Sequence, residues 1–266
     1  MRTFLVLVLM QVPLILLGQT IEPEQRMVQG DHGKLFTQAY KSKDFGRDPR
    51  LLVVLHGDAP RNKPGYHYRF AERAADAHTN LVAVGLLRPG YTDPVGNRSE
   101  GKRGNAVGDN WHGGNTDTIA AVIAQLAKDY GAGRVIVAGH SGGAALSANI
   151  LGRHPKLINA ALLVALPADL EAWRKHMLGH TKSQIFGKPI NSLSAIDLLP
   201  KVDPATQIHL IVGEKDRITP LWLSRRYHEQ AVKHGKQVEM TVLPEKGHEV
   251  FLHPAVFEKL ATLLAP

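Results

Sequence analysis

Short apolar runs alternate with helix-like stretches along most of the chain. The runs are rich in Val, Leu and Ile, and they lie at residues 50–57, 80–87, 134–141, 159–166 and 207–214. Strands that are short and apolar on both faces are typical of a parallel sheet covered by helices on two sides. Apolar residues at helical spacing fill the segments between, at residues 68–78, 116–130 and 144–153. The pattern therefore predicts an α/β fold with a mainly parallel, doubly wound sheet.

The last part of the chain continues the same pattern. Residues 236–244 have the alternation of a further strand, and residues 254–264 form a closing amphipathic helix whose first turn suits Pro254. About 40 residues separate Leu166 from Gln207, too few for a large separate cap. With no linker or internal repeat in sight, we expect one domain, with a small cap or none, over residues 21–266.

Residues 1–20 differ in character from this domain. Arg2 precedes an apolar run from Phe4 to Leu17, which is too short for a comfortable membrane span. Such a segment is typical of a signal peptide, here with cleavage after Gly18 or Thr20. We therefore expect a secreted or periplasmic protein that has no stable membrane span after cleavage. The chain has no Cys, so an oxidising compartment is permitted without disulfides.

Composition and charge exclude some classes of protein. Charged residues make up 21% of the chain and hydrophobic ones 44%, which is ordinary for a folded globular protein. The formal net charge is +8, but the basic residues are spread along the chain and are not interleaved with aromatic ones. Proteins that track a phosphate backbone concentrate such residues, so nucleic acid is not an expected partner.

The stretch "GHSGG" places Ser141 between two glycines at the end of an apolar run. A G-x-S-x-G turn can be very tight, because glycine lacks the Cβ that would clash where a strand and the next helix approach. The turn then exposes the serine at the carboxyl end of the sheet, where open α/β sheets bind ligands. An ordinary turn with Ser141 as a helix N-cap is the alternative. The presence or absence of partner residues for a nucleophile distinguishes these two hypotheses for Ser141.

A serine nucleophile needs a base to take its proton, and the base needs a carboxylate to orient it. Asp216 follows the strand that ends near Gly213, and His248 lies in a loop after the strand that ends near Leu243. The chain has 14 histidines, so it is this position after a strand that singles out His248. The order Ser141, Asp216, His248 predicts a catalytic triad. Asp169 also follows a strand and is the rival acid.

Catalysis at a carbonyl also needs hydrogen-bond donors for the oxyanion. The N–H of the residue after the serine, Gly142, is one candidate, and the backbone N–H of Asp58, just after a strand in "HGD", is the other. His56 in the same motif is expected to hold the turn rather than act as a base. Neither a metal ion nor an organic cofactor is required by this chemistry.

The segments "LLVVLHGD", "RVIVAGHSGG", "HLIVGEKDRITP" and "LPEKGHEVF" resemble the α/β-hydrolase superfamily, in particular its prolyl-oligopeptidase-like and dienelactone-hydrolase-like serine hydrolases. The resemblance spans residue 50 to the end, and it implies an α/β-hydrolase fold with Ser141, Asp216 and His248 as its triad. Two features depart from these enzymes. The stretch before Arg50 has no room for a gating propeller, and the nucleophile is serine where dienelactone hydrolases typically use cysteine.

The expected substrate is a small-molecule ester or amide. Residues 88–115 form a long, polar segment after a strand, and long connections at this edge are usually functional. Tyr91, Trp111 and, from a later segment, Trp173 could offer flat apolar contact to a substrate, and Arg98, Lys102 and Arg103 positive charge. Hydrolysis of carboxylic esters is favoured, with peptidase or amidase activity as the alternative. A hypothesis from a different class of protein is a secreted binding protein without catalytic activity.

Overall fold

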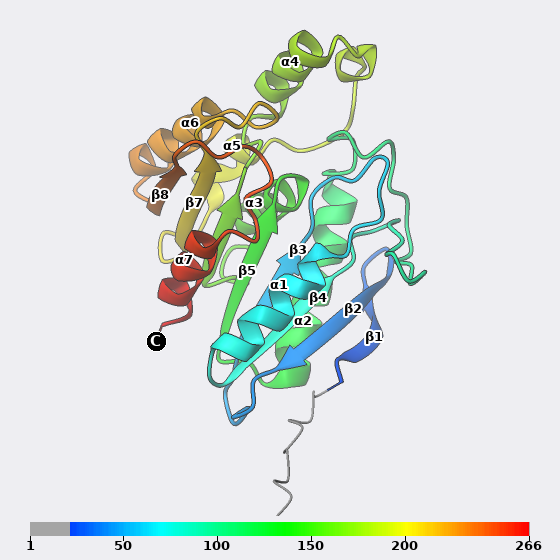
Figure 1. Ribbon diagram of the computed structural model, residues 1–266, viewed down its shortest axis with the longest axis vertical. Coiled ribbons are helices and arrows are strands. Elements are labelled where there is room, and N and C mark those ends of the chain that lie inside the picture. The colour runs from blue at the N-terminus through cyan, green and yellow to red at the C-terminus, as the bar shows by residue number, and fades with distance from the viewer. Residues whose placement is uncertain (1–21, 266) are drawn as a thin grey trace, which may run out of the picture.

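The computed structural model describes residues 22–265, which form an eight-stranded sheet covered by helices on both faces (Figure 1). The strands are β1 (Glu24–Gly30), β2 (Gly33–Lys41), β3 (Arg50–Leu55), β4 (Leu81–Leu86), β5 (Arg134–His140), β6 (Ala160–Val164), β7 (Gln207–Gly213) and β8 (Gln237–Leu243). They lie in the order β1-β2-β4-β3-β5-β6-β7-β8. The strands β3 to β8 are parallel, whereas β2 runs antiparallel to both of its neighbours. The predicted doubly wound sheet is confirmed.

Helices pack on both faces because the strands are apolar on both sides. They are α1 (Tyr66–Ala77), α2 (Gly113–Tyr130), α3 (Gly142–Arg153), α4 (Leu170–Thr181), α5 (Ala195–Leu198), α6 (Leu221–Lys233) and α7 (Pro254–Leu264). Alternate residues of β3 divide between two cores: Leu51 and Val53 belong to the core under α2 and α3, and Leu52 and Val54 to the core under α1 and α7. Every second side chain of a strand points to the same face, which produces this division.

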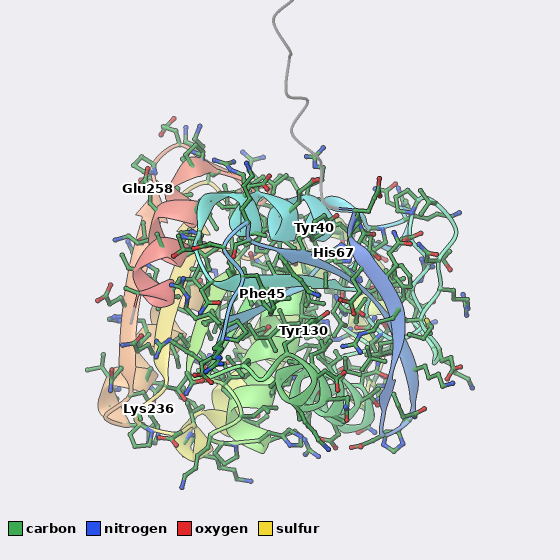
Figure 2. The ribbon with its side chains drawn as sticks, turned by 90° about the horizontal axis from the view of Figure 1, so that it is seen from below. Tyr40, Phe45, His67, Tyr130, Lys236 and Glu258 are labelled. Carbon is green, nitrogen blue, oxygen red and sulfur yellow. The ribbon has the colours of Figure 1, made fainter. Side chains whose placement is uncertain are left out.

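The strands β1 and β2 were not among the apolar runs of the sequence. They form a hairpin at the edge of the sheet, and most residues of β1 are at least partly exposed. Polar residues therefore dominate their sequences, and the strand signal is weak. The side chains of Arg26 and Lys41 lie over the ring of Tyr130, which ends α2 and is labelled in Figure 2. This contact joins the hairpin to the helix layer.

The segment between β6 and β7 is a small cap, as expected. It contains α4 and α5 with two short 3₁₀ turns, η1 (Gln184–Gly187) and η2 (Leu199–Lys201), and α4 rises above the carboxyl ends of the strands (Figure 1). Trp173 and Met177 of α4 are buried. Both side chains belong to the main hydrophobic core, so the cap is part of the same domain.

The predicted signal peptide, residues 1–20, lies outside the described residues. Export therefore stays a proposal, which mass spectrometry of the mature N-terminus would test: a start near residues 19–21 is expected, and an intact Met1 would contradict it. Within residues 22–265, no helix has the length and apolar character needed to cross a membrane.

Candidate active site

Ser141 lies at a strained turn between β5 and α3. Its backbone has φ 52° and ψ −118°, values that a residue with a side chain adopts only where the surroundings impose them. The surroundings here are tight: a Cβ on Gly139 would lie 2.6 Å from the carbonyl oxygen of Gly143, and a Cβ on Gly143 would lie 2.4 Å from that of Leu55. The two glycines of the motif thus permit the close approach that presents the Ser141 side chain at the sheet edge.

Asp216 and His248 meet although 32 residues separate them in the sequence. They lie in the loops after the adjacent parallel strands β7 and β8. Nδ1 of His248 donates to Oδ2 of Asp216 at 2.8 Å, and the backbone N–H and hydroxyl of Thr219 donate to the same carboxylate at 2.8 and 2.7 Å. Burial by itself raises the pKa of Asp216, but these hydrogen bonds and the charge on His248 outweigh burial and leave the pKa below its ordinary value. Asp216 is therefore an ionised acceptor that fixes the orientation of the imidazole.

Asp169, the rival acid, has a different position. Its side chain accepts the backbone N–H of Ala172 at 3.0 Å and so caps the N-terminus of α4. It also forms an ion pair with Arg226 at 2.7 Å. The structure pairs His248 with Asp216 and not with Asp169.

A chain of hydrogen bonds that the sequence analysis missed links the β3 loop to the His248 loop. The N–H of Gly57 donates to the hydroxyl of Tyr66 at 2.6 Å, and that hydroxyl lies 2.9 Å from Nδ1 of His140. Nε2 of His140 lies 3.2 Å from the carbonyl oxygen of His248. Burial lowers the pKa of His140 to about 3, so the ring is neutral, accepts at Nδ1 and donates at Nε2. The position of His140 just before Ser141 was the signal in the sequence.

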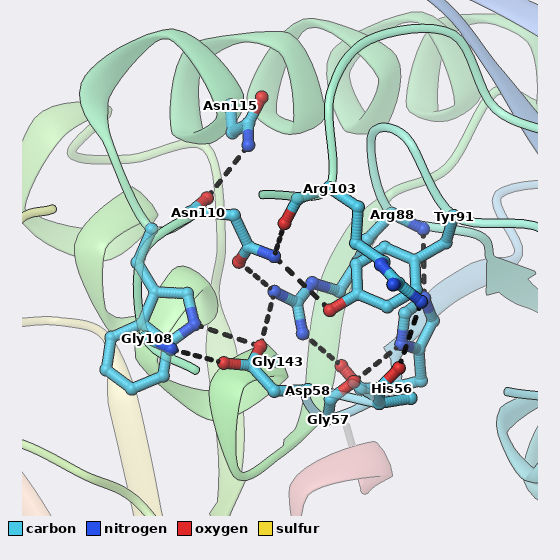
Figure 3. A network of polar contacts seen from close by, with 12 residues as sticks. His56, Gly57, Asp58, Arg88, Tyr91, Arg103, Gly108, Asn110, Asn115 and Gly143 are labelled. Carbon is cyan, nitrogen blue, oxygen red and sulfur yellow. Dashed lines mark hydrogen bonds and ion pairs between the residues drawn. The ribbon is translucent and has the colours of Figure 1, made fainter. Parts of the chain in front are cut away.

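The carboxylate of Asp58 is held from three sides (Figure 3). It accepts the guanidinium of Arg88 at 2.8 Å, the indole N–H of Trp111 at 3.1 Å and the backbone N–H of Gly108 at 2.8 Å. A Cβ on Gly142 would lie 2.2 Å from Oδ1 of Asp58, so only glycine fits there. Among the described residues, neither the Asp58 N–H nor the Gly142 N–H donates to a protein acceptor. The two predicted oxyanion donors are therefore free for a ligand.

Arg88 is the buried centre of this network and also escaped the sequence analysis. Its guanidinium donates to the carbonyl oxygen of His56 at 3.0 Å and to the side chain of Asn110 at 2.5 Å. The ring of His56 accepts the backbone N–H of Arg88 at 3.1 Å and is fully buried, which confirms the structural role expected for it. Arg88 thus ties the β3 loop to the segment that follows β4 (Figure 3).

A cleft of about 900 Å³ opens at Ser141 and His248. One wall is apolar and includes Trp111, Trp173, Met177, Phe186 and Ile218. The other is basic and includes Arg61 and Lys63, from the loop before α1, and Arg69 of α1 itself. Trp111 and Trp173 therefore lie where a substrate could touch them. Tyr91 does not: like Trp111 it is only 1% exposed, but it is not part of the lining of the cleft, and its ring lies 4.6 Å from that of His56. The segment folds back after Arg88, and this turns Tyr91 into the core.

The sequence of residues 92–265 matches the prolyl oligopeptidase family. The chain belongs to this family. It is therefore a serine hydrolase of the peptidase or esterase kind, and the predicted α/β-hydrolase relationship is confirmed. Among curated proteins, none has a sequence that matches the chain significantly.

Solved structures of several peptidases and of an esterase share the fold of this chain. The chain is similar to the Pyrococcus horikoshii acylaminoacyl peptidase, with a TM-score of 0.69 and 16% identity over 91% of this chain, and it spans 40% of the length of that peptidase. It is similar to the proline iminopeptidase of Mycobacterium smegmatis, with a TM-score of 0.67, 19% identity and coverage of 91% and 97% of the two chains. It is also similar to a Pyrococcus furiosus esterase, with a TM-score of 0.67, 20% identity and coverage of 91% of this chain and 89% of the esterase.

Residues 22–265 contain no group of three or more His, Cys, Asp or Glu side chains arranged to hold a metal ion. Near Ser141, the side chains of Asp58, His140 and Asp216 are hydrogen-bonded to other residues of the chain.

Proposed function

We propose that the protein is a carboxylesterase that acts through an acyl-enzyme on Ser141. The Ser141 hydroxyl attacks the ester carbonyl carbon, His248 accepts its proton, and the ionised Asp216 stabilises the imidazolium that forms. His248 then protonates the leaving alkoxide, and water releases the acyl group by the same steps. The observation that carries the proposal is the hydrogen bond from His248 to the buried Asp216, formed in the wall of the cleft that also exposes Ser141.

The oxyanion of the tetrahedral intermediate is assigned to the backbone N–H groups of Gly142 and Asp58. The Asp58 carboxylate lies close to this position, and a free negative charge there would oppose the developing oxyanion. The guanidinium of Arg88 and the N–H groups of Trp111 and Gly108 neutralise and hold the carboxylate. The same contacts fix the loop from which the Asp58 N–H projects.

Trp111→Phe is expected to lower kcat about tenfold with little change in KM. The variant keeps an aromatic ring in the cleft but loses one hydrogen bond to an ionised group, an interaction of about 1.5–3 kcal/mol. Trp173→Phe is the matched control, because Trp173 also lines the cleft and its indole N–H donates to the carbonyl oxygen of Ile218 instead. Steady-state kinetics of both variants provide the measurement. Equal losses of kcat in the two variants would contradict the role given to Asp58.

The charges of the cleft favour an ester substrate over a peptide with a free amino terminus. The lining contains three exposed cationic side chains, those of Arg61, Lys63 and Arg69. Among the described lining residues, only Glu249 has an exposed carboxylate that could neutralise part of this charge. A substrate with a free α-ammonium group would meet three like charges, at a cost that depends on salt. Peptidase or amidase activity on substrates with a blocked amino terminus is the second candidate, since acylaminoacyl peptidases share the fold.

A panel of 4-nitrophenyl esters, assayed beside aminoacyl and acylaminoacyl 4-nitroanilides, tests the proposal. We expect kcat/KM for the best ester to exceed that for the best anilide by about tenfold or more, because 4-nitrophenolate is a better leaving group than 4-nitroaniline and needs less help from the enzyme. Ser141→Ala in both assays measures the background. Anilide turnover above ester turnover would replace the esterase assignment with the peptidase one.

A further inference from the structure

A second cavity, of about 500 Å³, adjoins the catalytic cleft and has a cationic lining. It is lined by Lys63, Gly90, Thr92, Arg98, Gly101, Lys102 and Arg103. Lys63 lines the catalytic cleft as well, so the two hollows meet at this side chain. Four of the lining residues are cationic and none is acidic. The surface charge therefore continues from the basic wall of the cleft into the second cavity.

The acidic residues of the same segment point elsewhere. The carboxylate of Asp93 accepts the N–H groups of Val95 and Asn97, that of Asp109 accepts the N–H of Asn105 at 2.7 Å, and that of Glu100 accepts the N–H of Lys34 at 2.8 Å. Within residues 22–265, none of the four cavity cations forms an ion pair with a carboxylate. The cavity cations are thus left with uncompensated charge.

The cavity is shaped by close packing and by fixed side chains. Gly90 has φ +77°, and a Cβ there would lie 2.2 Å from the backbone nitrogen of Arg103. The loop backbone at Gly90 and at Arg103 is therefore in close contact. The guanidinium of Arg103 donates to the carbonyl oxygens of Ala59 and Pro60 at 3.2 and 3.4 Å, and that of Arg98 to the hydroxyl of Thr92 at 3.3 Å. Two of the cations are therefore held in place before any ligand binds, which reduces the entropy lost on binding.

We propose that this cavity is a subsite for an anionic group on the substrate, at a point remote from the scissile ester. The proposal rests on the esterase function and narrows it to esters that carry a carboxylate, sulfate or phosphate group. Ala59 and Pro60 line the cleft and are bonded to Arg103, so the subsite lies against the loop that supplies the Asp58 N–H. The apolar wall formed by Trp173 and Phe186 takes the uncharged part of the substrate.

Matched pairs of esters test the charge preference. One pair is 4-nitrophenyl hydrogen adipate with its neutral methyl ester, and the succinate and sebacate pairs vary the reach of the carboxylate. A further pair places the carboxylate on the alcohol instead of the acyl chain. In at least one pair, kcat/KM for the anionic ester is expected to exceed that for the neutral one by about tenfold at low salt and to lose the advantage at high salt. Equal rates in every pair would overturn the subsite.

The double variant Arg98→Ala/Lys102→Ala assigns the preference to this cavity. It should lower kcat/KM for the anionic ester about fivefold and leave the neutral ester unchanged. Lys175→Ala/Lys188→Ala is the matched control, since it removes the same charge from another hollow, beside α4. A loss for both esters, or the same loss in the control variant, contradicts the proposal.

Failure of the subsite and failure of the esterase function are distinguishable. If neutral and anionic esters are hydrolysed alike through Ser141, the subsite is wrong and the esterase assignment stands. If no ester is hydrolysed, binding of sulfate tests the subsite directly. Sodium sulfate should raise the Tm of the wild-type protein and of the Lys175→Ala/Lys188→Ala control more than that of Arg98→Ala/Lys102→Ala. Equal rises reflect only the general stabilisation by sulfate and overturn the subsite.

Discussion

Ser141→Ala is expected to lower kcat toward esters by about 10⁴-fold or more, because the variant lacks the atom that forms the acyl-enzyme. The oxyanion donors and the cleft remain, so a small residual rate above that of water is expected. The fold should survive, since alanine keeps the Cβ that the turn already accommodates. Initial rates on a 4-nitrophenyl ester and the Tm of both proteins provide the measurement.

Ser147→Ala is the matched control for this variant. Ser147 lies in the same helix, α3, and its buried hydroxyl donates to the carbonyl oxygen of Gly143. It should retain near wild-type kcat. A fluorophosphonate probe should label the wild type and the Ser147→Ala variant but not Ser141→Ala. Full activity of Ser141→Ala on an ester that the wild type cleaves would remove the proposed mechanism.

Asp216→Asn is expected to reduce kcat by about 10³–10⁴-fold. An asparagine can still accept the N–H groups of Ile218 and Thr219 through its oxygen, but it presents an amide N–H₂ toward Nδ1 of His248. The imidazole then carries its proton on Nε2, the nitrogen that must accept the proton of Ser141. Kinetics at several pH values, with Tm as a check of folding, measure the effect.

Asp169→Asn separates this role from a general effect of losing a carboxylate. Asparagine caps helices about as well as aspartate, so α4 should persist, and only the half-exposed ion pair with Arg226 is lost. A change in kcat of less than about twofold is expected. A severe loss in Asp169→Asn together with a mild one in Asp216→Asn would reverse the assignment of the acid.

The sequence predicted the parallel part of the sheet because its strands are buried on both faces. Such strands need apolar residues at every position, and β3 to β7 stand out from the polar turns that follow them. The hairpin of β1 and β2 lies at an edge and carries many polar residues, so its pattern resembles that of a loop. This difference in burial explains why the sequence predicted the parallel strands and not the β1–β2 hairpin.

The sequence by itself determined which loops form the site. Parallel strands bring their carboxyl ends to one edge, so Ser141, Asp216 and His248 had to lie at the same edge once the strands were recognised. The glycines around Ser141 carry local information of the same kind, since a tight turn excludes a Cβ. These inferences need only strand order and local sterics.

Only the tertiary structure decided which side chains of the loops face the cleft. Tyr91 and Trp111 belong to one polar segment, yet Tyr91 packs on His56 while Trp111 reaches Asp58 in the cleft wall. The same segment turns its carboxylates toward backbone N–H groups and its cations toward a cavity. An irregular loop has no repeating period, so the direction of each side chain follows from contacts with residues far away in the sequence.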